Sequence, residues 1–145
     1  MNWYAKHYLN DNTQMLYVMI DKEKNIPFGT IGYVEYDDEK DICISARLIA
    51  GDIRYQGSPY LIEGLILFFD YLYHDVGVKV IYSHVVSDNF PSLRLQKRLG
   101  FVENDVAYFP ERLHDSNFPM VEIVGNQKRY EIAKEKILKL LNGIL

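Results

Sequence analysis

The hydrophobic positions between residues 59 and 73 repeat at the spacing of an α-helix. The repeating positions are Ile62, Leu65, Phe69 and Leu72, with Leu61, Phe68 and Tyr73 beside them. Because residues three and four apart share one face of a helix, this pattern predicts a helix from Pro59 to Tyr73 that packs on a sheet. Pro59 suits the first turn, where its missing N–H removes no hydrogen bond.

Short apolar runs on both sides of this helix predict β-strands. The runs before it are Met15 to Ile20, Gly29 to Tyr36 and Ile42 to Ile49, and the run after it is Val78 to Val86. A polar turn from Asp21 to Asn25 joins the first two runs, which is the signal of a hairpin. We therefore expect three antiparallel strands ahead of the helix.

The rest of the chain predicts two more helices and two more strands. A helix from Leu93 to Leu99 ends at Gly100, a typical C-cap residue. The runs Val102 to Phe109 and Met120 to Val124 are expected strands, and Gly125-Asn126 is expected to end the second of them. From Gln127 onward, apolar residues at helical spacing predict an amphipathic C-terminal helix. These residues are Tyr130, Ala133, Ile137, Leu140 and Leu141.

The N-terminal residues Trp3, Tyr4, His7 and Tyr8 would share one face if their segment is helical. We divide the chain into a domain of residues 1–125 and a C-terminal helix of residues 126–145, packed on that domain or on a partner.

Composition narrows the class of protein. A chain of 145 residues with 48% hydrophobic residues is long and apolar enough for one folded domain. The formal net charge of −4 argues against a nucleic-acid-binding surface, which is normally basic. No apolar run reaches membrane-spanning length and no signal peptide is present, so we expect a cytoplasmic protein without a membrane partner. The single cysteine, Cys43, excludes an internal disulfide and is expected to be buried.

A glycine-containing loop precedes the first helix. In Arg54-Tyr55-Gln56-Gly57-Ser58, backbone N–H groups and the positive end of the helix dipole meet at one point, which suits a pyrophosphate. An ordinary turn, in which Gly57 supplies an unusual backbone angle, explains the same residues equally well. The segment after the fourth expected strand favours the pyrophosphate-binding interpretation. There, Asn89-Phe90-Pro91-Ser92 leads into a helix that ends in Leu99-Gly100-Phe101.

With both segments in place, the chain resembles the GNAT superfamily, the Gcn5-related N-acetyltransferases that use acetyl-CoA. The family's R/Q-x-x-G-x-G/A loop corresponds to Arg54–Pro59, and its Asn-x-x-Ser/Ala element corresponds to Asn89–Ser92. The residues of this second motif are most similar to the branch that includes ribosomal-protein N-terminal acetyltransferases and related small-substrate acetyltransferases. The resemblance implies an α/β fold with a mixed, mostly antiparallel central sheet flanked by helices, to which this chain adds its C-terminal helix.

The resemblance also implies which residues bind acetyl-CoA. They are Leu48, Ile49, Arg54, Tyr55, Gln56, Gly57, Ser58, Asn89 and Ser92. The backbone of Arg47, Leu48 and Ile49 is the expected contact for the acetyl-pantetheine arm and for the developing oxyanion. Family domains usually begin with a further strand and helix, which this chain lacks, so we expect a homodimer in which a partner covers the open sheet edge.

Two residues depart from the family pattern. Pro59 replaces the last Gly or Ala of the loop and has no N–H to donate. Gln96 stands where many members carry a tyrosine that protonates the leaving thiolate, and an amide is no acid. Ser92, or a water near Asn89, could substitute for that tyrosine, but we slightly favour the interpretation that Ser92 caps the helix.

The candidate general bases are Glu35 and His84, because both lie on strands beside the expected coenzyme site. A histidine titrates in the range that this task needs. His114 and Asp115 are weaker candidates in a loop, and the histidines have no spacing that indicates a metal site.

The sequence therefore predicts an N-acetyltransferase that uses acetyl-CoA as cosubstrate. It would act on a primary amine of a small molecule, an amino sugar or a peptide N-terminus. The alternative is a catalytically degenerate domain that binds acyl-CoA or a protein partner.

Overall fold

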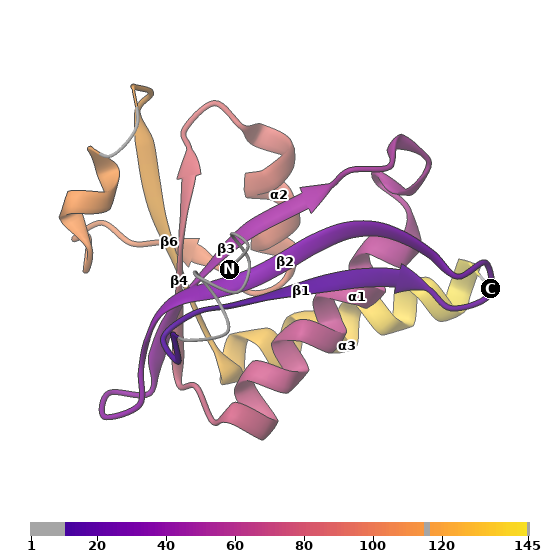
Figure 1. Cartoon of the computed structure of the whole chain (residues 1–145), viewed down its shortest axis with the longest axis horizontal. Helices are drawn as coiled ribbons and strands as arrows, with labels where there is room; N and C mark the ends of the chain where they lie inside the picture. Colours follow the sequence, from indigo (N-terminus) through magenta and orange to yellow (C-terminus); the bar gives the residue numbers. More distant parts are fainter. Residues whose placement is uncertain (1–10, 115–116, 145) are drawn as a thin grey trace. The chain divides into compact units, whose positions relative to one another are not determined.

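The computed structural model describes residues 11–114 and 117–144, and the chain divides into two compact units, Met1–Val78 and Lys79–Leu145. Figure 1 follows the chain through its elements. The strands are β1 (Met15–Asp21), β2 (Ile26–Asp37), β3 (Ile42–Ala50), β4 (Val80–Val86), β5 (Val102–Glu103) and β6 (Met120–Asn126). The longer helices are α1 (Pro59–Asp70), α2 (Phe90–Arg98) and α3 (Gln127–Ile144), and the short helical segments are η2 (Ile53–Tyr55), η3 (Tyr71–Val76) and η4 (Pro110–Leu113).

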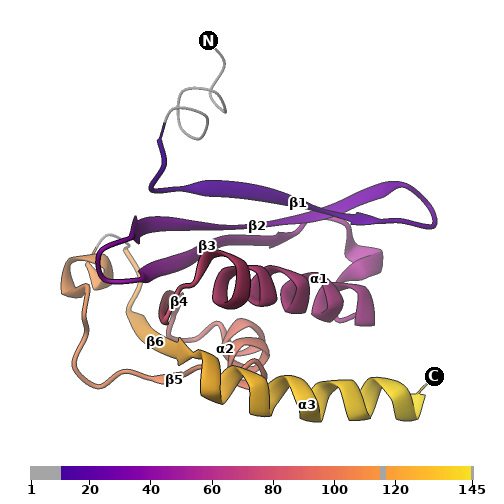
Figure 2. The ribbon, with the colours of Figure 1, turned by 90° about the horizontal axis from the view of Figure 1, so that it is seen from below.

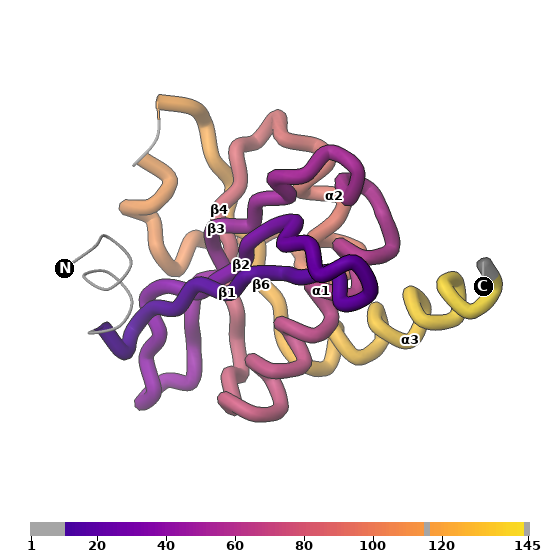
Figure 3. The backbone as a smooth tube through the Cα atoms, turned by 45° about the vertical axis from the view of Figure 1, so that its right-hand side comes forward, coloured from indigo at the N-terminus to yellow at the C-terminus, as the bar shows by residue number. Residues whose placement is uncertain are grey.

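The first unit is a three-stranded antiparallel sheet with a helix on one face. β1 pairs with β2 and β2 with β3, so the predicted hairpin and the three strands ahead of the helix are confirmed. Figure 3 traces this hairpin, in which the register runs from Met15 opposite Tyr33 to Asp21 opposite Ile26. α1 lies against this sheet (Figure 2), where the ring centroids of Tyr17 and Phe68 are 5.9 Å apart.

The predicted helix of residues 59–73 is confirmed, and it continues further than its hydrophobic pattern indicated. α1 ends at Asp70 and a π-helical segment carries the chain to Val76, where Gly77 takes a left-handed φ of 84°. Leu65 and Leu72 are 1% and 0% exposed, as the apolar stripe predicted. The wide turn lets Gly77 and Val78 both donate to the Leu72 carbonyl, which closes the helix.

The second unit is built on the antiparallel pair β4 and β6. β5 is a two-residue strand on the far edge of β6, so the prediction of a strand from Val102 to Phe109 is wrong beyond Glu103. The physical reason is that the N–H groups of Tyr108 and Phe109 donate to the side-chain carboxylate of Glu122 instead of to a backbone ladder.

The predicted C-terminal helix is confirmed as α3, which follows β6 without a connecting loop (Figure 2). Gly125-Asn126 was expected to end the strand, but β6 includes both residues. Tyr130 and Ile137 on the predicted apolar stripe are 1% and 3% exposed.

Some sequence predictions fall outside the described residues. The shared face of Trp3, Tyr4, His7 and Tyr8 lies there, as does Asp115. Within the described part of the chain, every helix is too short or too polar to cross a lipid bilayer.

Candidate functional site

The loop predicted to hold a pyrophosphate, here called the coenzyme loop, comprises Arg54–Pro59 in the first unit. Asp52 caps the 3-10 helix that opens it: its Oδ1 accepts from the N–H of Arg54, and the guanidinium of Arg54 donates to both carboxylate oxygens at 3.0 and 2.6 Å. These hydrogen bonds lower the pKa of Asp52 to about 2. Arg54 therefore keeps its charge at the loop, paired with an acid that an anionic ligand would have to replace or share.

Tyr55 fastens the coenzyme loop to the core. Its hydroxyl donates to Asp21 at 2.7 Å, and its ring stacks on Phe28 with centroids 4.6 Å apart. Donation to the carboxylate raises the pKa of Tyr55 to about 12, so the hydrogen bond persists across the neutral range. Because the side chain is buried, the role predicted for Tyr55 in binding acetyl-CoA is left to its main chain.

The rest of the loop holds its shape by hydrogen bonds of its own. The Gln56 side chain donates to the Ala50 carbonyl at 2.9 Å, and both the N–H and the hydroxyl of Ser58 donate to the Tyr55 carbonyl. Gly57 has a left-handed φ of 72°, which confirms the unusual backbone angle expected there. Pro59 opens α1 in its first turn, so the next N–H groups along the helix are the ones without an intrahelical partner.

A β-bulge lies at the positions expected to contact the acetyl-pantetheine arm. Thr30 pairs with Ile49 and Gly32 with Ala46, so Arg47 and Leu48 together face a single residue of β2. Arg47 takes a left-handed φ of 58°, and the Thr30 hydroxyl donates to its carbonyl at 2.9 Å. A bulge leaves its extra residue outside the regular ladder of the two strands.

Glu35, one of the two candidate bases, also lies at a bulge. The register of β2 and β3 shifts between Val34 and Asp37, and Glu35 takes a φ of 53°. Its side chain is exposed. The structure thus places Glu35 on the surface of the first unit.

In the second unit, Asn89 rather than Ser92 caps α2. The Asn89 side chain accepts from the N–H of Ser92 at 3.4 Å, so the helix starts at Phe90 and the interpretation of Ser92 as its cap is wrong. Ser92 lies in the first turn of the helix, where its hydroxyl accepts from the side-chain amide of Gln96 at 3.0 Å. Gln96, at the position of the family's acid, is buried and acts as a hydrogen-bond donor to Ser92.

His84, the other candidate base, is held by a carboxylate that the sequence did not single out. Its Nε2 lies 2.8 Å from Oε2 of Glu122, and the two side chains are 6% and 0% exposed. The residues are direct partners in the register of β4 and β6. Because Ser92 bonds to Gln96 and His84 to Glu122, the two predicted groups belong to separate hydrogen-bond clusters.

Aromatic rings surround the pair of His84 and Glu122. Tyr82 stacks on Tyr108 with centroids 4.9 Å apart, and Phe109 meets the His84 ring edge-on at 6.2 Å. The alternation of β4 alone places Tyr82 and His84 on one face, but the rings from residues 108 and 109 arrive by a loop whose path no periodicity indicates.

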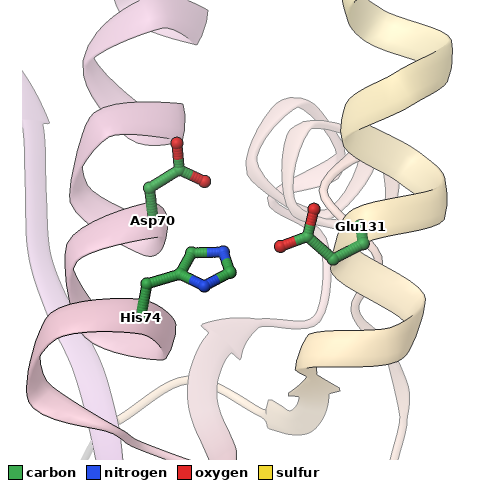
Figure 4. Close-up of side chains that lie close together, drawn as sticks. All are labelled: Asp70, His74 and Glu131. Atoms are coloured by element: carbon green, nitrogen blue, oxygen red, sulfur yellow. The ribbon is translucent and has the colours of Figure 1, made fainter.

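In the first unit, the acid Asp70 at the end of α1 and the imidazole of His74 in η3 lie on successive turns of one continuous helical segment (Figure 4). Residues four apart on a helix are neighbours, so this pair is ordinary in spacing. Figure 4 also includes Glu131, which comes from α3 in the second unit.

Comparison with known proteins gives a family and a fold. Residues 1–102 match a family model described as an acetyltransferase (GNAT) domain. No curated protein matches the sequence. Among solved structures, the spermidine N-acetyltransferase of Vibrio cholerae in complex with CoA and spermine has a TM-score of 0.71 at 19% identity, covering 88% of this chain and 73% of that one.

Two further solved structures of this kind agree. A chimera of the Vibrio cholerae spermidine N-acetyltransferase has a TM-score of 0.72 at 21% identity and covers 88% of this chain and 77% of its own. A dodecameric form of that enzyme has a TM-score of 0.70 at 21% identity and covers 88% of this chain and 72% of its own. These similarities confirm the predicted fold class, a mixed α/β domain with mostly antiparallel strands. The narrower placement in the ribosomal-protein branch and the missing first strand stay predictions.

Proposed function

Because the chain belongs to the GNAT acetyltransferase family, and is thus an N-acetyltransferase with acetyl-CoA as cosubstrate, we propose that it acetylates the primary amine of a small molecule. The observation that carries this proposal is the extent of the family match. Residues 1–102 contain the coenzyme loop, the bulge of β3 and the segment from Asn89 to Phe101. Both halves of the cosubstrate motif therefore lie inside the matched region.

Polyamines are the acceptor class that we propose first. The solved structures with the same fold include spermidine N-acetyltransferases, one of them with spermine bound. The formal net charge of −4 also favours a cationic acceptor over an anionic one. Amino sugars and peptide N-termini are the competing acceptors.

The roles proposed for the residues follow from their settings. Main-chain groups of Arg54–Ser58 would bind the pyrophosphate of acetyl-CoA, with Arg54 contributing charge. The backbone of Arg47, Leu48 and Ile49 would bind the acetyl-pantetheine arm and stabilise the oxyanion. Asn89 and Ser92 would support the same cosubstrate from the start of α2.

The reaction itself needs one proton acceptor. The neutral amine attacks the thioester carbonyl, a C–N bond forms, and the C–S bond breaks with its electron pair going to sulfur. The proton lost by the amine nitrogen passes to a base, for which we propose His84 over the exposed Glu35. The thiolate takes a proton from water, since Gln96 cannot supply one and a thiol is a tolerable leaving group near neutral pH.

The test combines binding with turnover. We expect acetyl-CoA and CoA to raise the melting temperature by several degrees at saturation, because a ligand at about a hundred times its Kd adds roughly 2.7 kcal/mol. CoA release should then be measured with spermidine, spermine, an amino sugar and a peptide with a free N-terminus. Stabilisation by CoA without acetylation of any amine would favour the degenerate binding domain.

A matched pair of glycine variants tests the coenzyme loop. Gly57 and Gly77 both have a left-handed φ, 72° and 84°, and an added Cβ meets nothing within 4 Å at either. Gly57→Ala should raise the KM for acetyl-CoA about tenfold, since one charge-assisted hydrogen bond is worth about 1.5–3 kcal/mol. Gly77→Ala should leave that KM unchanged. Equal KM values for the two variants would remove the loop from the site.

A further inference from the structure

We propose that Glu122 is the positioning residue of the reaction: it holds His84 in the tautomer whose Nδ1 accepts the proton of the attacking amine. This inference rests on the proposed function, because it assigns the base of that acetyl transfer. It adds a residue that neither the family match nor the sequence pattern indicates, and it gives His84 a specific reacting atom.

The carboxylate of Glu122 is fully buried and is the acceptor of four hydrogen bonds. Its Oε1 accepts from the Asn104 side chain at 2.7 Å and from the Tyr108 N–H at 2.7 Å. Its Oε2 accepts from the Phe109 N–H at 3.0 Å and lies 2.8 Å from Nε2 of His84. Burial alone would raise the pKa of Glu122, but these hydrogen bonds outweigh it and lower the pKa below its usual value.

An ionised carboxylate accepts hydrogen bonds and donates none, which fixes the proton on the imidazole. With Oε2 as its partner, Nε2 of His84 must carry the hydrogen, and the neutral ring then presents a lone pair at Nδ1. Nδ1 is buried and has no hydrogen-bond partner among the described residues. Buried polar atoms are almost always satisfied, so Nδ1 is the nitrogen of this ring that is left with the capacity to accept a proton.

The surroundings of the ring favour a proton acceptor over a structural histidine. The ionisable group in contact with the ring is Glu122 from β6, and Phe109 lies edge-on to the imidazole. Tyr82 and Tyr108 stack on each other and both contact the ring of Phe109. When the ring takes up a proton, the imidazolium is stabilised by the carboxylate already in contact with it. No movement of the protein is needed for that stabilisation, which is the property of a preorganised site.

The competing explanation is structural. Glu122 also binds the loop that carries Tyr108 and Phe109, so its removal could lower activity by loosening that loop. A measurement of the His84 tautomer separates the two explanations. Replacing the carboxylate next to Nε2 changes the preference for the hydrogen on that nitrogen, whereas loosening of the loop alone does not.

The experiment uses ¹⁵N-histidine-labelled protein and the variants Glu122→Gln, His84→Asn and Ile137→Ala. His84→Asn identifies the signals of residue 84 among the four histidines of the chain. In the wild type we expect Nε2 of His84 to bear the hydrogen and Nδ1 to be bare. In Glu122→Gln the amide can either donate or accept, so the preference for one tautomer should be lost.

Kinetics complete the test. Glu122→Gln should lower kcat at least about tenfold, with the roughly 10²–10⁴-fold contribution of general base catalysis as the ceiling on the loss, and change the KM for acetyl-CoA less than about twofold. Ile137→Ala, which opens a cavity under a side chain that is 3% exposed, is the control for lost stability. If its melting temperature falls as far as that of Glu122→Gln, Ile137→Ala should still retain its kcat.

Three results would overturn the proposal: a wild-type tautomer in Glu122→Gln with unchanged kcat, full activity in His84→Asn, or an equal loss of kcat in Ile137→Ala. If the wild type acetylates no amine, the proposed function fails on its own, and the spectrum still reports whether Glu122 sets the tautomer.

Discussion

At the residue scale, the buried acids of this chain are stabilised mainly by hydrogen bonds from neutral donors. Asp21 accepts from the Tyr55 hydroxyl and from the N–H groups of Glu23 and Lys24, and the tyrosine contributes most to lowering the pKa of Asp21. Glu122 follows the same rule in the second unit. Such a carboxylate favours the folded state only while it is ionised.

This rule gives a prediction for the pH dependence of stability. The folded-state pKa of Glu122 lies below its unfolded value, so its contribution is fully present above the unfolded pKa and is lost as pH falls through the folded pKa. Glu122→Gln should therefore melt well below the wild type at pH 7. The difference should shrink on acidification, as thermal melts between pH 7 and pH 3 would show, and a constant difference would contradict the assignment.

Cys43 gives a second prediction at this scale. The side chain is 0% exposed, and burial raises the pKa of its thiol to about 12, so almost no thiolate forms at neutral pH. A thiol reagent should leave the native protein unmodified and label one cysteine in denaturant. The measurement is mass spectrometry after a timed exposure. Rapid labelling of the folded protein would show that β3 opens locally.

Which residues could be foreseen depended on how local their environment is. Gly57, Gly100 and Cys43 were predictable because a turn, a helix end and an apolar run each determine them within a few neighbours. Glu122 was not, since in Met120–Val124 it looks like the exposed position of an edge strand. Its burial depends on residues 84, 104, 108 and 109, and only the fold brings these to it.

At the element scale, the helices were more predictable than the segments around them. The apolar stripe determined α1 and α3, because one buried face needs a regular spacing. The strand expected from Val102 to Phe109 failed for the opposite reason. Its N–H groups found a side-chain acceptor instead of a neighbouring strand, and hydrophobicity does not report on hydrogen-bond partners.

The end of α2 offers a prediction about how elements pack in the second unit. Gly100 has a φ of 92°, and a Cβ there would lie 2.8 Å from the backbone carbonyl carbon and oxygen of Arg129 in α3. Gly100→Ala should cost about 1 kcal/mol for the left-handed backbone and roughly a further 1–3 kcal/mol for overpacking. Denaturant unfolding measures the sum.

Gly77→Ala is the matched control, because Gly77 has a similar φ of 84° and open space around its Cα. It should show the backbone cost alone. If the two variants lose the same stability, then α2 and α3 are not in the close contact that the structure gives them.

At the scale of the whole molecule, the family and fold were predictable and the acceptor was not. The cosubstrate is the same throughout the family, so the loop Arg54–Pro59 and the segment Asn89–Phe101 keep a recognisable form. We expect the acceptor to be chosen by side chains from several segments that are distant in the sequence. No single stretch of sequence carries that choice.

The prediction at this scale is self-association. Among the described residues β1 pairs only with β2, and its Val18 and Ile20 are 56% and 52% exposed. An open edge with apolar side chains tends to pair with another chain unless charges protect it. We expect light scattering to give the mass of a dimer or a larger assembly for the wild type.

The alternative contact is α3, whose Ile132 is likewise 52% exposed. Two lysine variants distinguish the surfaces: Val18→Lys/Ile20→Lys places charge on β1, and Ile132→Lys places it on α3. Each substitution replaces an exposed residue, so both variants should fold. If only the β1 variant becomes monomeric, the sheet edge is the interface. If only Ile132→Lys does, then the terminal helix joins the copies, and a monomeric wild type at all concentrations would remove the expectation of a dimer.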